Sequence, residues 1–197
     1  MQDMVRLREW WLSQAVAFLA GHMKVCGLSL PVAGVRVSCG WPSQGGLSLS
    51  GRVVIGQCFS PQVSKDGTAQ IFVSPRVDDS IQVLGVLLHE LVHAAVGNQY
   101  GHRKEFSQAA RRVGLDGPPT ATVVGEKLRP VLAGFVERYG SYPHAAIRPV
   151  PKPKVGSRLR LYECACSPPF KVRIASDVFS ARCLRCHEVF VKKEGDE

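Results

Sequence analysis

Three histidines and one glutamate lie close together near the middle of this 197-residue chain. His89, Glu90 and His93 form the pattern H-E-x-x-H, and His102 follows nine residues after His93. Residues four apart on a helix lie one turn apart on the same face, so the imidazoles of His89 and His93 can bind one metal ion. Glu90 lies next to that ion without having to bind it, where its carboxylate can take a proton from water. The pattern predicts a zinc peptidase site.

A catalytic zinc ion needs a third protein ligand and an open position for water. His102 is the predicted third ligand, because it follows a glycine-containing loop and begins the next helix, from which the chain can fold back over the metal. Glu105 is an alternative ligand, although its position also fits a solvated helix face. In metzincins the third histidine comes sooner, so the spacing argues against that class.

The predicted chemistry is hydrolysis of a peptide bond. Zinc lowers the pKa of a water molecule towards ~7 and polarises the carbonyl that is attacked. Glu90 accepts the proton and passes it to the leaving amine, a role worth about 10²–10⁴-fold in rate. Two alternatives stay open: a helix with two ordinary histidines and a surface glutamate, or a static zinc site that uses a fourth protein ligand.

A second set of metal-ligand residues lies near the C-terminus. Cys164-Ala-Cys166 and Cys183-Leu-Arg-Cys186 have the spacing of two turns that grip one structural zinc ion, as in zinc ribbons. The first pair is C-x-C instead of C-x-x-C, so either Cys166 binds with an altered turn or His187 replaces one ligand. The sequence therefore predicts two Zn²⁺ ions per chain, one catalytic and one structural, and zinc binding would largely supply the folding energy of the ribbon.

The chain is basic, with 25 Lys and Arg against 16 Asp and Glu and a formal charge of +9. Such a charge favours an anionic partner, with nucleic acid first. Residues 152–193 carry ten basic and three acidic residues, interleaved with Tyr162, Phe170 and Phe179. This predicts a surface that follows a DNA backbone and stacks bases, including those of single-stranded DNA. The predicted contacts are Arg158, Arg160, Lys171, Arg173, Arg182 and Arg185. The alternative is a solvated basic ribbon.

The elements that must position these residues indicate an α+β fold. Hydrophobic residues make up 45% of the chain and charged residues 21%, as in a folded globular protein. A first helix is expected over 4–26, followed by a three-stranded antiparallel sheet from 32–38, 47–59 and 69–73. A helix capped by Asp78, Asp79 or Ser80 then carries the histidine motif to Val96. The next helix has an apolar face made of Phe106, Ala109, Ala110 and Val113. A last helix over 126–139 is kinked or started late by Pro130.

The chain is expected to divide into a metallopeptidase domain (1–148), a Pro/Lys linker (149–157), a small β zinc ribbon (158–193) and an acidic tail (194–197). Cys26, Cys39 and Cys58 are scattered, which favours a reducing compartment over a disulfide framework. No segment has the ~18 apolar residues of a membrane span. The run 10–20 could imitate a signal peptide, but its helical spacing and charged flank favour an amphipathic helix. A cytoplasmic, nucleoid-associated protein is expected, or one of the host cytoplasm if a phage encodes it.

The motifs HELVH and G-H-x-x-x-F (101–106), followed by a four-cysteine ribbon, resemble the SprT-like family. Its members include the Spartan-type DNA-dependent proteases of DNA–protein crosslink repair. The stretches 112–115, 120–122 and Tyr142-Pro143-His144 are similar to small bacteriophage and bacterial members. The resemblance implies a zincin-like fold, zinc on His89, His93 and His102, a catalytic Glu90 and cleavage of DNA-bound proteins. The C-x-C pair departs from the family's usual ribbon.

Two functions compete on this evidence. The first is a zinc metallopeptidase that acts on DNA-associated proteins. The second is a non-catalytic zinc-dependent DNA-binding or transcription-associated module that keeps a peptidase scaffold. Glu90 discriminates between them, because a module without chemistry has no evident need for an acid there. His144 either reaches the cleft as a transition-state stabiliser or has a capping or packing role.

Overall fold

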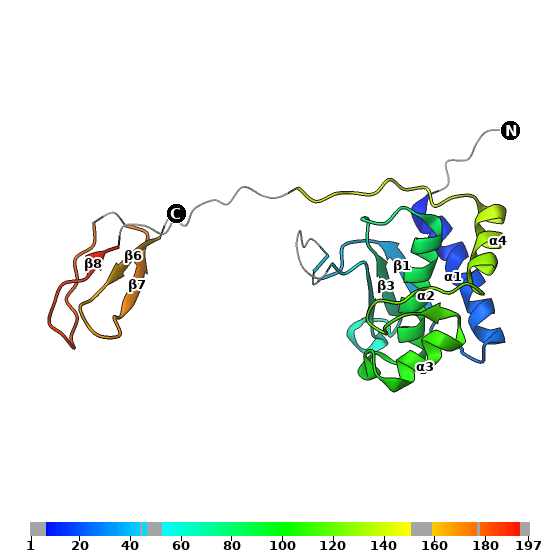
Figure 1. Ribbon diagram of the computed structural model, residues 1–197, viewed down its shortest axis with the longest axis horizontal. Coiled ribbons are helices and arrows are strands. Elements are labelled where there is room, and N and C mark those ends of the chain that lie inside the picture. The colour runs from blue at the N-terminus through cyan, green and yellow to red at the C-terminus, as the bar shows by residue number, and fades with distance from the viewer. Residues whose placement is uncertain (1–6, 44, 47–52, 151–158, 177, 194–197) are drawn as a thin grey trace. The chain divides into compact units, whose positions relative to one another are not determined.

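The computed structural model describes residues 7–43, 45–46, 53–150, 159–176 and 178–193. The chain is a mixed α+β protein that divides into two compact units, Met1–Val150 and Pro151–Glu197 (Figure 1). Several predicted features lie outside the described residues: the ends of two elements (4–6 and 47–52), linker residues 151–157, Arg158 and the tail 194–197. No described helix is long and apolar enough to cross a membrane.

The first unit begins with helix α1 (Arg8–Val25), which confirms the predicted helix over its described part. Its buried residues recur at helical spacing, because Trp11, Ala15, Leu19 and Met23 are four residues apart and fully buried. The helix packs on strand β1 (Val35–Cys39) and on the later helices, so a continuous core forms between the helices and the sheet. In Figure 1 the helices lie together on one side of that sheet.

The sheet is mixed, so the prediction of an all-antiparallel sheet is wrong. Its order is β1-β3-β2, where β2 is Gly56–Phe59 and β3 is Ala69–Val73. Strand β3 pairs antiparallel with β2, as expected for strands joined by a short connection with one 3-10 turn (η1, Pro61–Val63). It pairs parallel with β1, because the long segment between them leaves room for a crossover. The alternate side chains of β3 are buried, as its central position requires.

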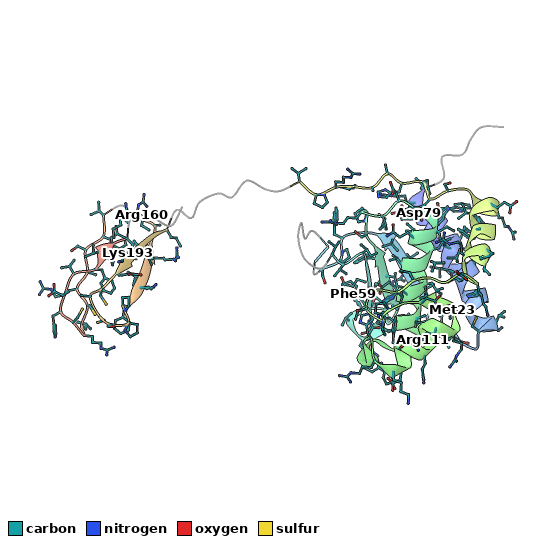
Figure 2. All side chains as sticks on the ribbon, in the orientation of Figure 1. Met23, Phe59, Asp79, Arg111, Arg160 and Lys193 are labelled. Carbon is teal, nitrogen blue, oxygen red and sulfur yellow. The ribbon has the colours of Figure 1, made fainter. Side chains whose placement is uncertain are left out.

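Helix α2 (Ser80–Val96) carries the histidine motif and contacts β2, β3 and every other helix of the unit. Of the three predicted caps the structure uses Asp79, whose carboxylate accepts a hydrogen bond of 2.8 Å from the backbone N–H of Gln82 (Figure 2). The helix ends at Gly97, which has a φ of 101° that an L side chain rarely adopts. Ten of its residues are buried, so its position is strongly determined by packing.

The remaining elements of this unit follow α2. A 3-10 turn η2 (Asn98–Tyr100) leads into α3 (Lys104–Arg112), whose predicted apolar face is confirmed by burial of Phe106, Ala109 and Ala110. Helix α4 (Arg129–Tyr139) starts late, with Pro130 in its first turn, where a missing N–H costs nothing. Between them lies a hairpin that the sequence did not predict, β4 (Leu115–Asp116) with β5 (Val123–Val124). Strands of two residues are too short to show a period.

The second unit contains β6 (Arg160–Glu163), β7 (Lys171–Ile174) and β8 (Val191–Lys192) in the order β7-β6-β8. Both pairings are antiparallel. Among its described residues only Tyr162, Cys164 and Cys183 are buried, so this unit has very little apolar core. A unit of this size needs a further source of stability, such as a bound metal.

Candidate metal centre

The fold brings three imidazole nitrogens to one point. His102 Nε2 lies 3.2 Å from His89 Nε2 and 3.2 Å from His93 Nε2. Ligand nitrogens on a tetrahedral zinc ion, with bonds of about 2.05 Å, lie roughly 3.3 Å apart. A neutral imidazole nitrogen has one hydrogen or one lone pair, so hydrogen bonding alone does not readily account for two such contacts at His102. The spacing and the donor type fit a metal ion.

The loop after α2 brings His102 back over the helix. Gly97 and Gly101 both have positive φ, which allows the tight turn. Asn98 fastens the loop to β2, because its side-chain amide donates a 2.6 Å hydrogen bond to the carbonyl of Cys58. Glu105, the alternative ligand, is exposed in the first turn of α3 and is not part of the histidine group.

Two residues hold the imidazoles in place. The ring of Phe106 is stacked on that of His93, with centroids 4.1 Å apart, and lies within 5.0 Å of the other two imidazoles. The hydroxyl oxygen of Thr122 lies 2.8 Å from His89 Nδ1, so it can accept a hydrogen bond from the Nδ1–H group. The proton then stays on Nδ1, and Nε2 keeps its lone pair for a metal. Thr122 belongs to the stretch 120–122 that carried part of the family resemblance, but the sequence predicted no site role for it. Its contact with His89 depends on the β4–β5 hairpin, which brings the turn 120–122 to α2 and which only the tertiary structure reveals.

Electrostatics keep the histidines in their ligand form. Burial, together with the neighbouring His102, lowers the pKa of His89 to about 4. Burial, together with the other two histidines, lowers the pKa of His93 to about 3. Both imidazoles are therefore neutral at pH 7, and only a neutral imidazole can ligate a metal through its lone pair.

Glu90 lies beside the histidines in the interior, with 7% of its surface exposed. Burial raises the pKa of its carboxyl to about 8, although a hydrogen bond from the backbone of Cys58 acts in the opposite direction. Strand β2 approaches α2 closely here: a Cβ on Gly56 would lie 2.5 Å from Glu90 Oε1. Only glycine allows this approach, so Gly56 is a site residue that the sequence analysis missed.

These groups face an open cleft of about 300 Å³. One wall consists of β2 and the residues before it, the floor is α2, and the third side is the turn 120–122. All four residues of the predicted site (His89, Glu90, His93 and His102) line this cleft. The arrangement provides three imidazole nitrogens, a buried carboxyl group and space for a ligand beside them.

The four cysteines of the second unit also converge. The sulfur atoms of Cys164, Cys166, Cys183 and Cys186 all lie within 4.8 Å of one another, and those of Cys166 and Cys183 are 3.8 Å apart. Zn–S bonds of about 2.3 Å in a tetrahedron place the sulfurs roughly 3.8 Å apart, so this group also fits a zinc ion. Backbone N–H groups of residues 185 and 186 lower the pKa of Cys183 to about 6. His187 is exposed and is not part of the cysteine group.

The predicted DNA contacts of the second unit are only partly available. Arg173, Arg182 and Arg185 are exposed. Arg160 donates a 2.8 Å hydrogen bond to the carbonyl of Ala175. Lys171 pairs with Glu163 at 3.1 Å. Arg160 and Lys193, both labelled in Figure 2, lie on this unit, and Lys193 pairs with Glu163 at 3.5 Å.

The prediction of three stacking aromatics is wrong for one residue and weakened for a second. Tyr162 is buried and packs against the half-buried Phe179, with ring centroids 4.9 Å apart, because this small unit uses the Tyr162 ring as core. Phe170 is 49% exposed and remains available to a base.

His144 has a packing role instead of a place in the cleft. Its Nε2 lies 2.9 Å from the carbonyl oxygen of Pro75, and its Nδ1 lies 3.1 Å from Arg8 Nη1. These contacts hold the segment after α4 near the start of α2, whereas the metal-ligand histidines lie in the second half of that helix. The transition-state alternative for His144 therefore has no support in this geometry.

The chain was also compared with known proteins. No protein-family model, curated protein or solved structure matches it. The resemblance to the SprT-like family therefore stays a prediction, carried by the motifs alone.

Proposed function

We propose that this protein is a zinc-dependent metallopeptidase that acts on DNA-associated proteins. The observation that carries the proposal is the convergence of three imidazoles beside a buried Glu90 in an open cleft, with His102 Nε2 3.2 Å from Nε2 of each of the other two. Three histidines with an open side are the ligand set of catalytic zinc, whereas structural zinc is enclosed by four protein ligands. The alternative of a non-catalytic module gives no reason for a buried carboxyl group in that position.

Each residue of the site has a defined task in this mechanism. His89, His93 and His102 would hold the ion, and Thr122 orients His89 through Nδ1. The zinc ion, when bound, supplies Lewis acidity that activates water and polarises a carbonyl. The Glu90 carboxylate takes a proton from the attacking water and returns it to the leaving amine. Burial raises the pKa of Glu90 in the metal-free protein, and the charge of a bound zinc ion would act in the opposite direction and favour the carboxylate that this step requires.

The second unit supports the DNA-binding part of the proposal through charge. The arginines at 173, 182 and 185 are exposed, the last two beside Cys183 in the chain, and exposed guanidinium groups bind phosphate well. The chain as a whole carries a formal charge of +9. The two lysines bound to Glu163 contribute less, since their charge is partly neutralised.

The proposal is tested by cleavage of a basic protein bound to DNA, with and without single-stranded DNA. Replacing the carboxylate in Glu90→Gln should slow cleavage about 10²–10⁴-fold while the zinc content stays the same. Glu105→Gln is the matched control, because it makes the same chemical change on an exposed residue of α3. Equal cleavage by wild type and Glu90→Gln would rule out the mechanism. Tight DNA binding without cleavage by either would favour the non-catalytic module.

A further inference from the structure

The face of α2 that carries the metal ligands also carries an apolar residue. Val86, His89, Glu90 and His93 occupy positions i, i+3, i+4 and i+7, so they form one stripe along the helix. Gly56 of β2 packs over this stripe: a Cβ there would lie 2.7 Å from Val86 Cγ1 and 2.5 Å from Glu90 Oε1. Val86 is therefore in the cleft, one helical turn from the carboxyl group.

Further apolar side chains line the cleft, alongside uncharged polar ones such as Gln57, Asn98 and Thr120. Val53, Val54 and Ile55 line it from the segment before β2, and Ala121 lines it from the opposite side. Val53 is 38% exposed, so an apolar side chain is open to a ligand there. Among the described lining residues Glu90 is the one acidic group, and no lysine or arginine lines the cleft. Among the described lining residues an entering aspartate would find no basic partner, and a lysine would find Glu90 alone, which the proposed reaction uses.

We propose that the cleft selects an apolar side chain next to the peptide bond that is cleaved, and that Val86 is the main specificity-determining residue. This inference rests on the proposed function and adds the class of substrate side chain to it. Recruitment of the substrate protein and choice of the cleaved bond are then two separate steps of recognition. DNA brings a basic protein to the enzyme, whereas the bond that is cleaved lies beside an aliphatic residue and not beside a lysine or arginine.

The test uses three peptide hydroxamates that differ only in the side chain next to the hydroxamate: leucine, lysine or aspartate. The hydroxamate group binds the metal, so affinity for the zinc-loaded full chain can be measured by calorimetry without turnover. We expect the leucine compound to bind at least about tenfold more tightly than the other two, since a lost aliphatic contact alone is worth roughly that factor. The charge introduced by Val86→Asp should shift the preference towards lysine.

Two further variants keep the test decisive. The side chain in Val86→Thr has nearly the shape of valine but carries a hydroxyl group, so this variant should reduce the preference for leucine. It provides the test if Val86→Asp does not fold. Val131→Asp is the matched control, because Val131 is 38% exposed on α4 and does not line the cleft. It should leave all three affinities unchanged.

The outcomes separate this inference from the proposed function. Equal affinities for the three hydroxamates, or a preference for lysine or aspartate in the wild type, would overturn the inference even if DNA-bound proteins are cleaved. A preference for leucine that is lost in Val86→Thr would support it even if no protein is cleaved, in which case the proposed function would fail alone. Failure to bind any hydroxamate would overturn both.

Discussion

At the scale of single residues, the contact between Thr122 and His89 decides which imidazole nitrogen faces the cleft. The Thr122 hydroxyl oxygen lies 2.8 Å from His89 Nδ1. A ligating histidine usually donates its second N–H to such a partner, which fixes the tautomer and makes the other nitrogen a better ligand. Thr122 is therefore part of the candidate site, although it does not belong to the histidine motif.

The change Thr122→Val removes the acceptor while it keeps the shape of the side chain. We expect the affinity of the histidine site for zinc to fall about 10–100-fold, the usual effect of losing such a partner. Competition with a fluorescent chelator measures this affinity. Thr120→Val is the control, since Thr120 is an exposed residue of the same turn. Equal affinities for the two variants would show that the contact does not orient His89.

Glu90 predicts a pH dependence of stability in the metal-free protein. Its pKa is raised from 4.5 to about 8 by burial, so the folded state favours the protonated carboxyl. The contribution of Glu90 to stability is therefore most favourable below about pH 4.5 and is lost as the pH rises towards 8, where the folded state must carry a buried charge. In Glu90→Gln this loss is absent.

The comparison of wild type with Glu90→Gln isolates this effect, because the histidines and the second unit contribute equally to both. In the presence of a chelator, we expect the variant to melt on the order of 5 °C above wild type at pH 8. At pH 4.5 the difference should be much smaller. A difference that does not change with pH would contradict the assigned role of burial.

At the scale of elements, the site depends on the close approach of β2 to α2. The glycine at position 56 lets the strand pass directly over Glu90 and Val86. The backbone of Cys58 then donates a hydrogen bond to the Glu90 carboxyl and accepts one from Asn98. One short edge strand thus positions both Glu90 and the loop that carries His102.

A methyl group at position 56 should disturb Glu90, the proposed general base, more than the three histidines. In Gly56→Ala the new Cβ would lie 2.5 Å from Glu90 Oε1, so the strand or the carboxyl group must move. We expect cleavage to slow at least about tenfold with zinc content retained, measured by peptide hydrolysis and metal analysis. The control is Gly134→Ala on α4, where no heavy atom lies within 4 Å of the added Cβ. That change should stabilise the helix by about 1 kcal/mol. Normal activity of Gly56→Ala would show that the close approach is dispensable.

At the scale of the whole molecule, each compact unit has its own group of metal donors. The first unit contains three histidines and a large apolar core, and the second contains four cysteines and almost no core. We therefore expect the first unit to fold without a metal, and the second to depend on metal binding for most of its folding energy.

The variant Cys183→Ser tests this division of roles. We expect metal analysis to find two zinc ions per chain in the wild type and one in the variant. Hydrogen exchange should show loss of protection in the second unit only, because its few buried residues cannot hold it together alone. Cys26→Ser, outside the cysteine group, should keep both ions. A wild-type chain that binds a single ion, and loses it in Cys183→Ser, would argue against the histidine site.

Much of the candidate site could be predicted from the sequence, because its information is local. Helical spacing alone places His89 and His93 on one face, and the glycines around the following loop explain how His102 returns to them. The apolar spacing around Phe106 and the capping residue Asp79 are likewise properties of short segments. Each depends on residues only a few positions apart, where the geometry of one helix or turn is sufficient.

Only the tertiary structure decided the remaining features, because each depends on segments distant in the chain. The parallel pairing of β1 with β3 requires a long crossover that no local pattern specifies. Contact between Thr122 and His89 joins residues 33 positions apart. Burial of Tyr162 follows from a shortage of core in its unit, which overrides its predicted role in stacking. The sequence alone thus determined which groups could bind a metal, and packing determined what surrounds them.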